Sequence, residues 1–302
     1  MIVACGLTPA WQRTLVFDGW QVDAVNRAVE AHACGGGKVL HVGLALHFLG
    51  AESATVALLG GPAGRLIEDE LVGLGLSLRP VASSRETRTC TTVLDRSTAG
   101  MTELVENAGE AEPRELEALL EAFGEVAGRA DRVVLTGSLP AGTPPDFYRR
   151  LLERTTAEAI LDVRGAELVE ALPLRPFLVK PNREELARTV GRELENEVAV
   201  FAAMAQIRAA GATWVVVTDG ARGVQVSGPD TRLSFPTLTA PVVNPIGCGD
   251  YLAAGIAYAL EGGRSVPDAV AVGIACATEN VRSLSPARLD RARVEDLART
   301  VG

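Results

Sequence analysis

The sequence lacks the cysteine and histidine spacings on which disulfide-rich and zinc-binding proteins depend. Its five cysteines are scattered and never spaced C-x-x-C, and its three histidines form no H-E-x-x-H motif. This usage is typical of a reducing compartment and argues against a histidine metal centre. The first seven residues carry no basic region and predict a buried strand instead of a signal peptide. We therefore expect a cytoplasmic protein.

Long apolar runs and positive charge are also scarce. The longest apolar runs, 251–260 and 269–278, are shorter than the ~20 residues that a membrane-spanning helix needs. The 29 basic residues are outnumbered by 38 acidic ones, the net charge is −9, and no basic block occurs. These features argue against a membrane or a nucleic acid as partner. Anions must be bound by local geometry, because the overall field of the chain repels them.

The apolar residues that are present, 47% of 302, suffice for a large buried core. From about residue 133 onward, β-branched runs alternate with amphipathic runs, which predicts a parallel sheet covered by helices on both faces. The expected strands are 132–136, 159–163, 177–180 and 214–218, and the expected helices are 144–156, 183–190 and 197–210. Ligand sites in such sheets lie beyond the carboxyl ends of the strands, and the motifs of this chain fall there.

The first third of the chain shows a different pattern. Short, polar runs separated by turns predict a small antiparallel lid over the ligand edge of the main sheet. These runs are 13–17, 88–94 and 101–106. No linker rich in proline, glycine or serine and no internal repeat interrupts the sequence. We therefore expect a single domain over 1–302, with lid strands contributed by about 9–31 and 86–108.

The segment 244–250, Asn-Pro-Ile-Gly-Cys-Gly-Asp, is the most informative motif, and an apolar helical stretch follows it directly. Gly247 and Gly249 allow backbone N–H groups to surround an anion, and the positive end of the following helix points to the same place. Asp250 adds a carboxylate on the first turn of that helix. A carboxylate beside an anion hole suits a general base that deprotonates a hydroxyl during phosphoryl transfer. The alternative is an ordinary aspartate at a helix N-terminus.

A second glycine loop, 34–38, precedes a predicted helix over 39–49. It is not a Walker A loop, because Lys38 is followed by Val39 instead of serine or threonine, and the G-x-G-x-x-G spacing of a dinucleotide fingerprint is absent. The loop permits a ligand to approach the backbone closely. A plain glycine turn would explain it as well.

Two further strand ends carry polar residues. Asn182 and Glu185 share one face of a first helical turn. Their oxygens suit magnesium there, or they form a routine capping pair. The segment 217–223 runs from a predicted strand into a glycine-bounded turn. Its hydroxyl and N–H groups can hold nucleotide phosphates, or the segment is a simple β-turn.

Taken in order, these motifs resemble the ribokinase/PfkB family of carbohydrate kinases over nearly the whole chain. The segments 136–142, 26–27 and 87–89 make the resemblance closest to the branch that contains 1-phosphofructokinase and tagatose-6-phosphate kinase. It implies an α/β fold, a ribokinase-like three-layer sandwich with a mostly parallel central sheet and a small antiparallel β lid. It also implies an ATP- and Mg²⁺-dependent kinase of a sugar phosphate, and a homodimer formed through the lid.

The resemblance implies a role for each matching residue. Asp250 would be the general base, and the N–H groups of Gly247, Cys248 and Gly249 would form the anion hole. The residues implied at the ATP end are Lys180, Asn182, Thr218, Gly220 and Gly223, with Asn182 and Glu185 organising Mg²⁺. The residues implied at the acceptor end are Gln12, Arg27, Gly37, Lys38, His41, Arg88 and Ser138, together with Asp250. In that set, Arg27 and Arg88 would grip the phosphate already on the sugar.

Three positions depart from the family pattern. Gln12 stands where the family usually has a sugar-binding aspartate, and His41 where it usually has a sugar-binding asparagine. Losing a charged acceptor costs roughly 1–2 kcal/mol of binding, so the two changes indicate a different hydroxyl pattern on the acceptor. The alternatives are a kinase of an unphosphorylated sugar or a nucleoside, and a sugar-binding relative without turnover. Cys248 replaces alanine or serine, and its place at a helix N-terminus predicts a lowered thiol pKa and an inactivating alkylation that ATP slows.

Overall fold

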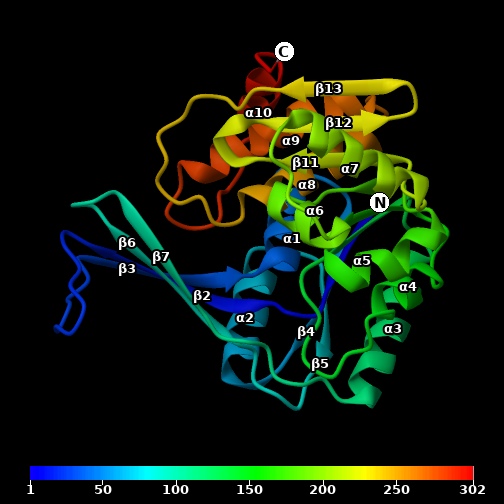
Figure 1. The fold of residues 1–302 in the computed structure, drawn as a ribbon. Coiled ribbons are helices and arrows are strands. Elements are labelled where there is room, and N and C mark those ends of the chain that lie inside the picture. Colours follow the sequence, from blue (N-terminus) through cyan, green and yellow to red (C-terminus); the bar gives the residue numbers. More distant parts are fainter. Residues whose placement is uncertain (302) are drawn as a thin grey trace.

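A computed structural model describes residues 1–301 of the chain. Its main sheet has nine strands in the order β13-β12-β11-β10-β9-β8-β1-β4-β5 (Figure 1). Pairing is parallel from β11 through to β5, whereas β12 and β13 are added antiparallel at one edge. The strands are β1 (Ile2–Gly6), β4 (Ser53–Leu59), β5 (Leu78–Ala82), β8 (Arg132–Thr136), β9 (Glu158–Asp162), β10 (Leu178–Val179), β11 (Trp214–Thr218), β12 (Val224–Gly228) and β13 (Thr231–Phe235).

The central strands are buried on both faces, as their β-branched composition predicted. In β1, Ile2 and Ala4 belong to one hydrophobic core, whereas Val3 and Cys5 belong to a second. Because successive side chains of a strand point to opposite faces, the sheet carries one core on each side.

Helices cover both cores, which confirms the predicted three-layer α/β sandwich. One core is covered by α1 (Lys38–Phe48), α2 (Gly61–Gly73), α8 (Cys248–Glu261), α9 (Val266–Val281) and α10 (Arg291–Ala298). The other is covered by α3 (Pro113–Ala127), α4 (Phe147–Leu152), α5 (Gly165–Ala171), α6 (Arg183–Val190) and α7 (Glu197–Ala209). Two short 3₁₀ helices, η1 (Leu172–Leu174) and η2 (Gly220–Arg222), complete the connections.

Several predicted elements have the expected bounds. The strands 132–136 and 214–218 and the helix 183–190 are β8, β11 and α6. The helix predicted over 144–156 is shorter at both ends, since α4 spans Phe147–Leu152. Pro145 disfavours helical backbone at the residue before it, which keeps Pro144 out of the helix. No helix within residues 1–301 combines the length and the hydrophobicity that crossing a membrane requires.

A second, four-stranded sheet projects from the main body and forms the lid (Figure 1). Its strands, in spatial order, are β3 (Glu30–Gly36), β2 (Ala10–Phe17), β6 (Thr89–Asp95) and β7 (Gly100–Val105). The outer pairs β2–β3 and β6–β7 are antiparallel, as predicted, while β2 and β6 pair in parallel. Strand β3 continues past residue 31 into the second glycine loop, so the lid is connected directly to α1.

Candidate active site

The carboxyl ends of β9, β10 and β11 meet the lid at a cavity of about 390 Å³. Lid side chains such as Gln12 and Glu103 line it from one side, and the first turn of α8 lines it from another. The predicted site residues that line this cavity are Gln12, Gly37, Lys38, His41, Arg88, Lys180, Asn182, Glu185, Thr218, Gly247, Cys248, Gly249 and Asp250. The tertiary structure therefore gathers both predicted glycine loops and two of the predicted strand ends at one place.

The loop before α8 has the geometry of an anion site. Gly247 is the N-cap of the helix with φ +82°, a left-handed conformation that glycine adopts without strain. The N–H groups of Gly247 and Gly249 donate to no group within residues 1–301, and that of Cys248 makes only a long contact of 3.4 Å to the oxygen of Pro245. Asp250 lies on the first helical turn, beside these donors. Free N–H groups at a helix N-terminus favour a bound anion.

Asp250 forms a hydrogen bond that the sequence did not predict. Its Oδ2 lies 2.8 Å from Nδ1 of His41, and the two side chains are only 8% and 5% exposed. His41 comes from α1, behind the second glycine loop. The two motifs, read separately in the sequence, are therefore joined by a direct contact between side chains.

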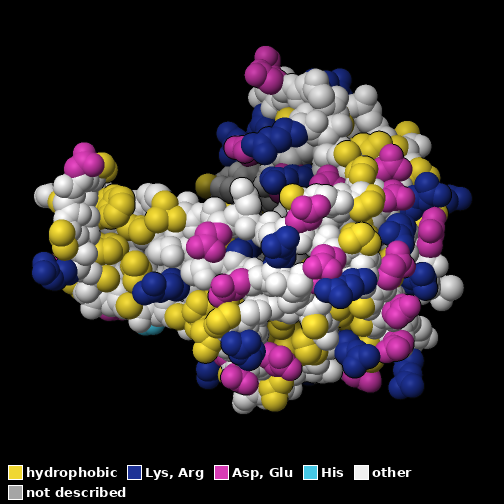
Figure 2. Space-filling view, turned by 90° about the horizontal axis from the view of Figure 1, so that it is seen from below, with side chains coloured by type: hydrophobic (Ala, Val, Ile, Leu, Met, Phe, Trp, Pro, Cys, Tyr) yellow, Lys and Arg dark blue, Asp and Glu magenta, His cyan; other side chains and the backbone are white. Residues whose placement is uncertain are grey.

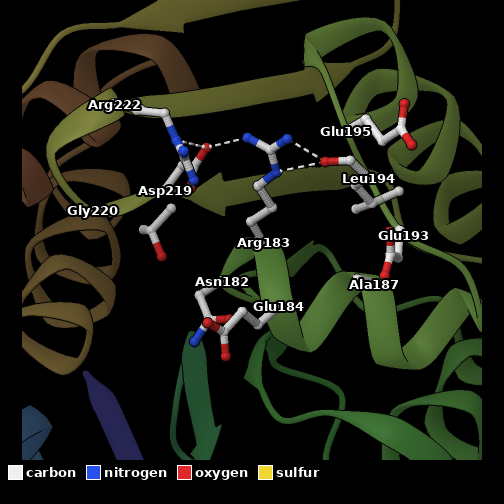
Figure 3. A pocket seen from close by; sticks show the side chains of 11 residues that line it. Asn182, Arg183, Glu184, Ala187, Glu193, Leu194, Glu195, Asp219, Gly220 and Arg222 are labelled. Atoms are coloured by element: carbon white, nitrogen blue, oxygen red, sulfur yellow. Dashed lines mark hydrogen bonds and ion pairs between the residues drawn. The ribbon is translucent and has the colours of Figure 1, made fainter.

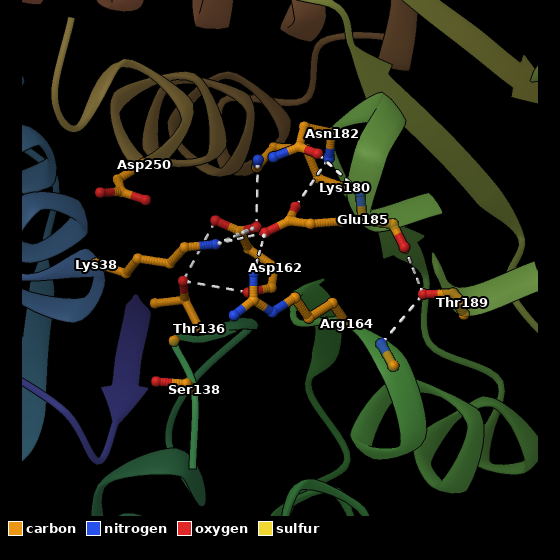
Figure 4. Close-up of polar contacts among 12 residues, drawn as sticks. Lys38, Thr136, Ser138, Asp162, Arg164, Lys180, Asn182, Glu185, Thr189 and Asp250 are labelled. Carbon is orange, nitrogen blue, oxygen red and sulfur yellow. Dashed lines mark hydrogen bonds and ion pairs between the residues drawn. The ribbon is translucent and has the colours of Figure 1, made fainter. Parts of the chain in front are cut away.

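Two lysines, the buried Lys180 and the partly exposed Lys38, converge on one carboxylate at the floor of the cavity (Figure 4). Asp162 Oδ1 lies 3.2 Å from Nζ of Lys38 and 3.3 Å from Nζ of Lys180, while Thr136 donates to Oδ2 at 3.3 Å. Burial alone would raise the pKa of Asp162, but the ammonium groups of Lys180 and Lys38 outweigh it and hold that pKa below its usual value. Burial opposes protonation of Lys38, yet the surrounding carboxylates raise its pKa above the usual value.

Asn182 and Glu185 form the capping pair that was one of the two predicted alternatives. Asn182 Oδ1 accepts from the Glu185 N–H at 2.8 Å, and Glu185 Oε2 accepts from the Asn182 N–H at 2.9 Å. The other carboxylate oxygen, Oε1, lies 3.6 Å from Nζ of Lys38. Within residues 1–301, no group of three or more His, Cys, Asp or Glu side chains is arranged to hold a metal ion. A magnesium ion held here would therefore keep most of its water or phosphate ligands, as that ion prefers.

A second cavity, of about 590 Å³, adjoins the first and shares Asn182 and Thr218 with it (Figure 3). Asp219 joins two guanidinium groups there, Arg183 at 2.7 Å and Arg222 at 2.7 Å. Burial opposes ionisation of Asp219, but hydrogen bonds from both arginines hold its pKa below the usual value. Gly220, predicted at the ATP end, lines this cavity.

Three predicted residues lie outside both cavities. Gly223 lines neither; its φ is +107°, and an added Cβ would lie 2.2 Å from the oxygen of Phe235, so close packing explains this glycine. Ser138 lines a smaller cavity of about 120 Å³ together with Lys38 and Arg88. Arg27 is exposed on the loop between β2 and β3, and the structure of a single chain does not bring it to the site.

Two carboxylates that line the main cavity were not among the site residues predicted from the sequence. Asp162 ends the predicted strand 159–163, and its position at a carboxyl strand end was a usable signal. Glu103 reaches the cavity from β7, where a partial loss of solvent raises the pKa of its carboxyl. The only sequence feature that pointed to Glu103 was the alternation of residues within a short lid strand. Alternation alone does not tell which face of that strand is covered.

The expected pKa of Cys248 was wrong in direction. Burial of the thiol raises its pKa, and this outweighs the hydrogen bond from Asn280. The expectation rested on the helix N-terminus, which lowers a thiol pKa. The loss of solvent around the sulfur acts in the opposite direction. The predicted ATP-sensitive alkylation stays a prediction, and the raised pKa means that it requires alkaline conditions.

Unpaired backbone donors and the ammonium groups of Lys38 and Lys180 favour a phosphorylated ligand, and a carboxylate capable of accepting a proton lies beside them. At the carboxyl edge of a parallel α/β sheet, this combination is typical of enzymes that transfer phosphoryl groups. The family model of pfkB carbohydrate kinases matches residues 12–290. The chain belongs to this family, which confirms the resemblance seen in the motifs, and it is a carbohydrate kinase, a phosphotransferase with an alcohol acceptor.

Solved structures share the whole fold. Phosphofructokinase-2 from Escherichia coli in complex with substrates and products has a TM-score of 0.92 at 21% identity, with 99% of each chain covered. A protein described as a possible 1-phosphofructokinase from Thermotoga maritima has a TM-score of 0.90 at 20% identity, covering 100% of this chain and 98% of that one. Ribokinase from Arabidopsis thaliana complexed with ribose and ATP has a TM-score of 0.76 at 20% identity, with 98% of each chain covered. The predicted ribokinase-like architecture is thereby confirmed.

Proposed function

We propose that this chain transfers the terminal phosphoryl group of ATP to a hydroxyl of a sugar phosphate, with Asp250 as general base. One observation carries the proposal: the unpaired N–H groups of Gly247 and Gly249 and the carboxylate of Asp250 lie on a single helical turn that lines the cavity. Phosphoryl transfer to an alcohol needs an anion hole and a base close together. This turn supplies both.

In the proposed reaction, Asp250 accepts the proton of the acceptor hydroxyl as the new O–P bond forms. The bond from the terminal phosphorus to the bridging oxygen of ATP breaks in the same in-line displacement, and ADP leaves with that electron pair. The N–H groups at the start of α8 hold the charge on the moving group. The lid strands exclude water, so that the hydroxyl of the sugar is the nucleophile.

Kinases of the pfkB family use ATP, typically with Mg²⁺. We assign the ATP end to Lys180, Asn182, Thr218 and Gly220, which lie at the ends of β10 and β11. Mg²⁺, when bound, neutralises charge on the phosphates and orients them. Asn182 and Glu185 would hold it largely through its water molecules, since their oxygens also form the helix cap.

The acceptor end is assigned to the side of the cavity nearest Arg88. Its guanidinium donates to the backbone oxygens of Thr8 at 3.0 Å and Glu106 at 3.2 Å. Its Nε is buried and has no hydrogen-bond partner within residues 1–301. A buried donor without a partner favours a ligand that accepts hydrogen bonds. The positive charge of the guanidinium on the cavity wall is what favours a phosphorylated sugar over an unphosphorylated one.

A screen for ATP consumption in the presence of Mg²⁺, run across sugars, nucleosides and sugar phosphates, tests this function. We expect turnover with one or a few sugar phosphates and little with the other two groups. Turnover confined to a nucleoside or an unphosphorylated sugar would contradict the proposed acceptor. Binding of a sugar without any ATP consumption would instead indicate a relative that has lost catalysis.

Arg88→Ala is expected to raise the KM of the phosphorylated acceptor by about tenfold to a hundredfold, the usual cost of losing a hydrogen bond between charged groups. The KM of ATP should change little, because Arg88 lies at the lid end of the cavity. Arg149→Ala, on the exposed surface of α4, is the matched control. An unchanged KM for the acceptor in Arg88→Ala would remove the arginine from phosphate binding.

We also propose that two copies pair through their lids. The exposed hydrophobic side chains of the lid are Trp20, Val22, Val25, Val29, Met101, Leu104 and Val105. Val105 lines the main cavity, so its neighbour Leu104 lies on the opposite face of β7. Figure 2 shows hydrophobic side chains gathered on the projecting lid. An apolar patch of this kind favours a protein partner, and a second copy of the lid would cover it. Arg27 lies on the same loop as Val22 and Val25, so pairing of the lids would place it at the surface between the two copies.

The lid pairing is tested by light scattering after size-exclusion chromatography. We expect a dimer for the wild type and a monomer for Val25→Glu, because Val25 is 82% exposed and would carry a charge into the interface. The matched control is Val198→Glu, since Val198 is 79% exposed on α7, away from the lid. A monomeric wild type, or a dimer that Val25→Glu leaves intact, would contradict the proposal.

A further inference from the structure

The side chain of His41 is enclosed by the two glycine loops. An added Cβ on Gly247 would lie 2.9 Å from Nδ1 of His41, and one on Gly36 would lie 3.5 Å from Nε2. The ring of Tyr251 lies 6.4 Å away, centroid to centroid. The imidazole is thus held at a fixed position on the wall of the cavity, against the turn that carries Asp250.

The two polar groups have no other hydrogen-bond partners within residues 1–301. Nδ1 of His41 and Oδ2 of Asp250 form the single bond given above, while Nε2 of His41 and Oδ1 of Asp250 make none. A carboxylate can only accept a hydrogen bond, so Nδ1 must carry the proton when Asp250 is ionised. This leaves Oδ1 free to receive a proton from a ligand.

We propose that His41 is a positioning residue for Asp250, holding the carboxylate through Nδ1–H so that Oδ1 faces the acceptor hydroxyl. The assignment rests on the proposed function of Asp250 as general base. Without that hydrogen bond, the carboxylate can rotate within the cavity, and a displacement of about 1 Å at a reacting group can cost 10²-fold in rate. His41 therefore has a task at this position that differs from binding the sugar.

Two variants distinguish the roles of the two ring nitrogen atoms of His41. The side-chain nitrogen of asparagine is attached at Cγ, like Nδ1 of histidine, whereas that of glutamine is one bond further out, like Nε2. His41→Asn keeps a donor toward Asp250, and His41→Gln does not. We expect kcat of His41→Gln to be about tenfold below that of His41→Asn, the loss typical of a hydrogen bond to a charged group. His47→Gln, further along the same helix, is the matched control and should keep the wild-type kcat.

The tautomer of His41 is measured independently of catalysis, on the protein without nucleotide or sugar. A long-range ¹H–¹⁵N spectrum distinguishes the protonated ring nitrogen from the bare one, and the loss of one set of signals in His41→Asn identifies His41 among three histidines. We expect the Nδ1–H tautomer in the wild type, and a shift away from it in Asp250→Ala.

The results separate this inference from the proposed function. An Nε2–H tautomer in the wild type, or equal kcat values for His41→Asn and His41→Gln, would overturn the positioning role while leaving the kinase intact. A lower kcat for His41→Asn than for His41→Gln would overturn it as well, in favour of a role for Nε2. If the wild type transfers no phosphoryl group but shows the Nδ1–H tautomer, the proposed function fails and the positioning role falls with it.

Discussion

Asp250→Asn is expected to lower kcat by about 10²–10⁴-fold, the contribution typical of a general base. Asparagine has nearly the same shape, can still accept the hydrogen bond from His41, and leaves the N–H groups of the turn in place. It cannot take a proton from an alcohol. The dissociation constant of ATP, measured by calorimetry, should therefore stay close to that of the wild type.

The matched control for this variant is Asp268→Asn. Asp268 also lies on the first turn of a helix, α9, but it is exposed and interacts with Ser265. It should keep the wild-type kcat, because an aspartate outside the cavity has no part in proton transfer. Wild-type turnover in Asp250→Asn, or a loss confined to ATP binding, would remove Asp250 from the proposed mechanism.

Asp162→Ala is expected to lower the free energy of unfolding by about 3–5 kcal/mol, the usual cost of leaving a buried charge without its partner. Asp162 is 1% exposed, and its carboxylate lies within 3.3 Å of the ammonium groups of both Lys38 and Lys180. The variant leaves two positive charges close together at the floor of the cavity. Urea unfolding at neutral pH measures the loss.

The contribution of Asp162 also depends on pH in a defined direction. Its pKa is lower in the folded protein than in the unfolded chain, where it is about 3.9. The stabilisation is therefore complete above that value and is lost as the pH falls through the lower, folded-state pKa. The difference between wild type and Asp162→Ala should shrink in strong acid. A small difference at neutral pH would contradict this account.

Asp131→Ala serves as the control for unfolding. Its carboxylate forms an ion pair with the N-terminus, but the side chain is 71% exposed. Solvent screens such a pair, so the urea midpoint should change little. A shift as large as that of Asp162→Ala would show that burial is not what makes the Asp162 network matter.

Most helices and strands of the fold could be predicted from the local sequence. The strand 214–218 and the helix 183–190 have their predicted bounds because each combines a clear periodicity with a glycine or capping signal at its ends. One glycine in each loop meets a local requirement of the backbone, since φ is near +85° at Gly37 and Gly247. The predicted role of these loops in holding a ligand stays a prediction. Prediction failed where solvent matters: the helix N-terminus suggested a lowered pKa for Cys248, but only packing reveals that the thiol loses enough solvent for its pKa to be raised.

By itself, the sequence determined the family, the three-layer architecture and the identity of Asp250 as the candidate base, because glycine loops and strand periodicity are short-range features of the chain. Only the tertiary structure decided which side chains meet. The bond from His41 to Asp250 spans 209 positions, and the pairing of Lys38 with Asp162 spans 124. Such contacts depend on how strands and helices pack, since distant residues approach one another only when the sheet brings their ends to one edge.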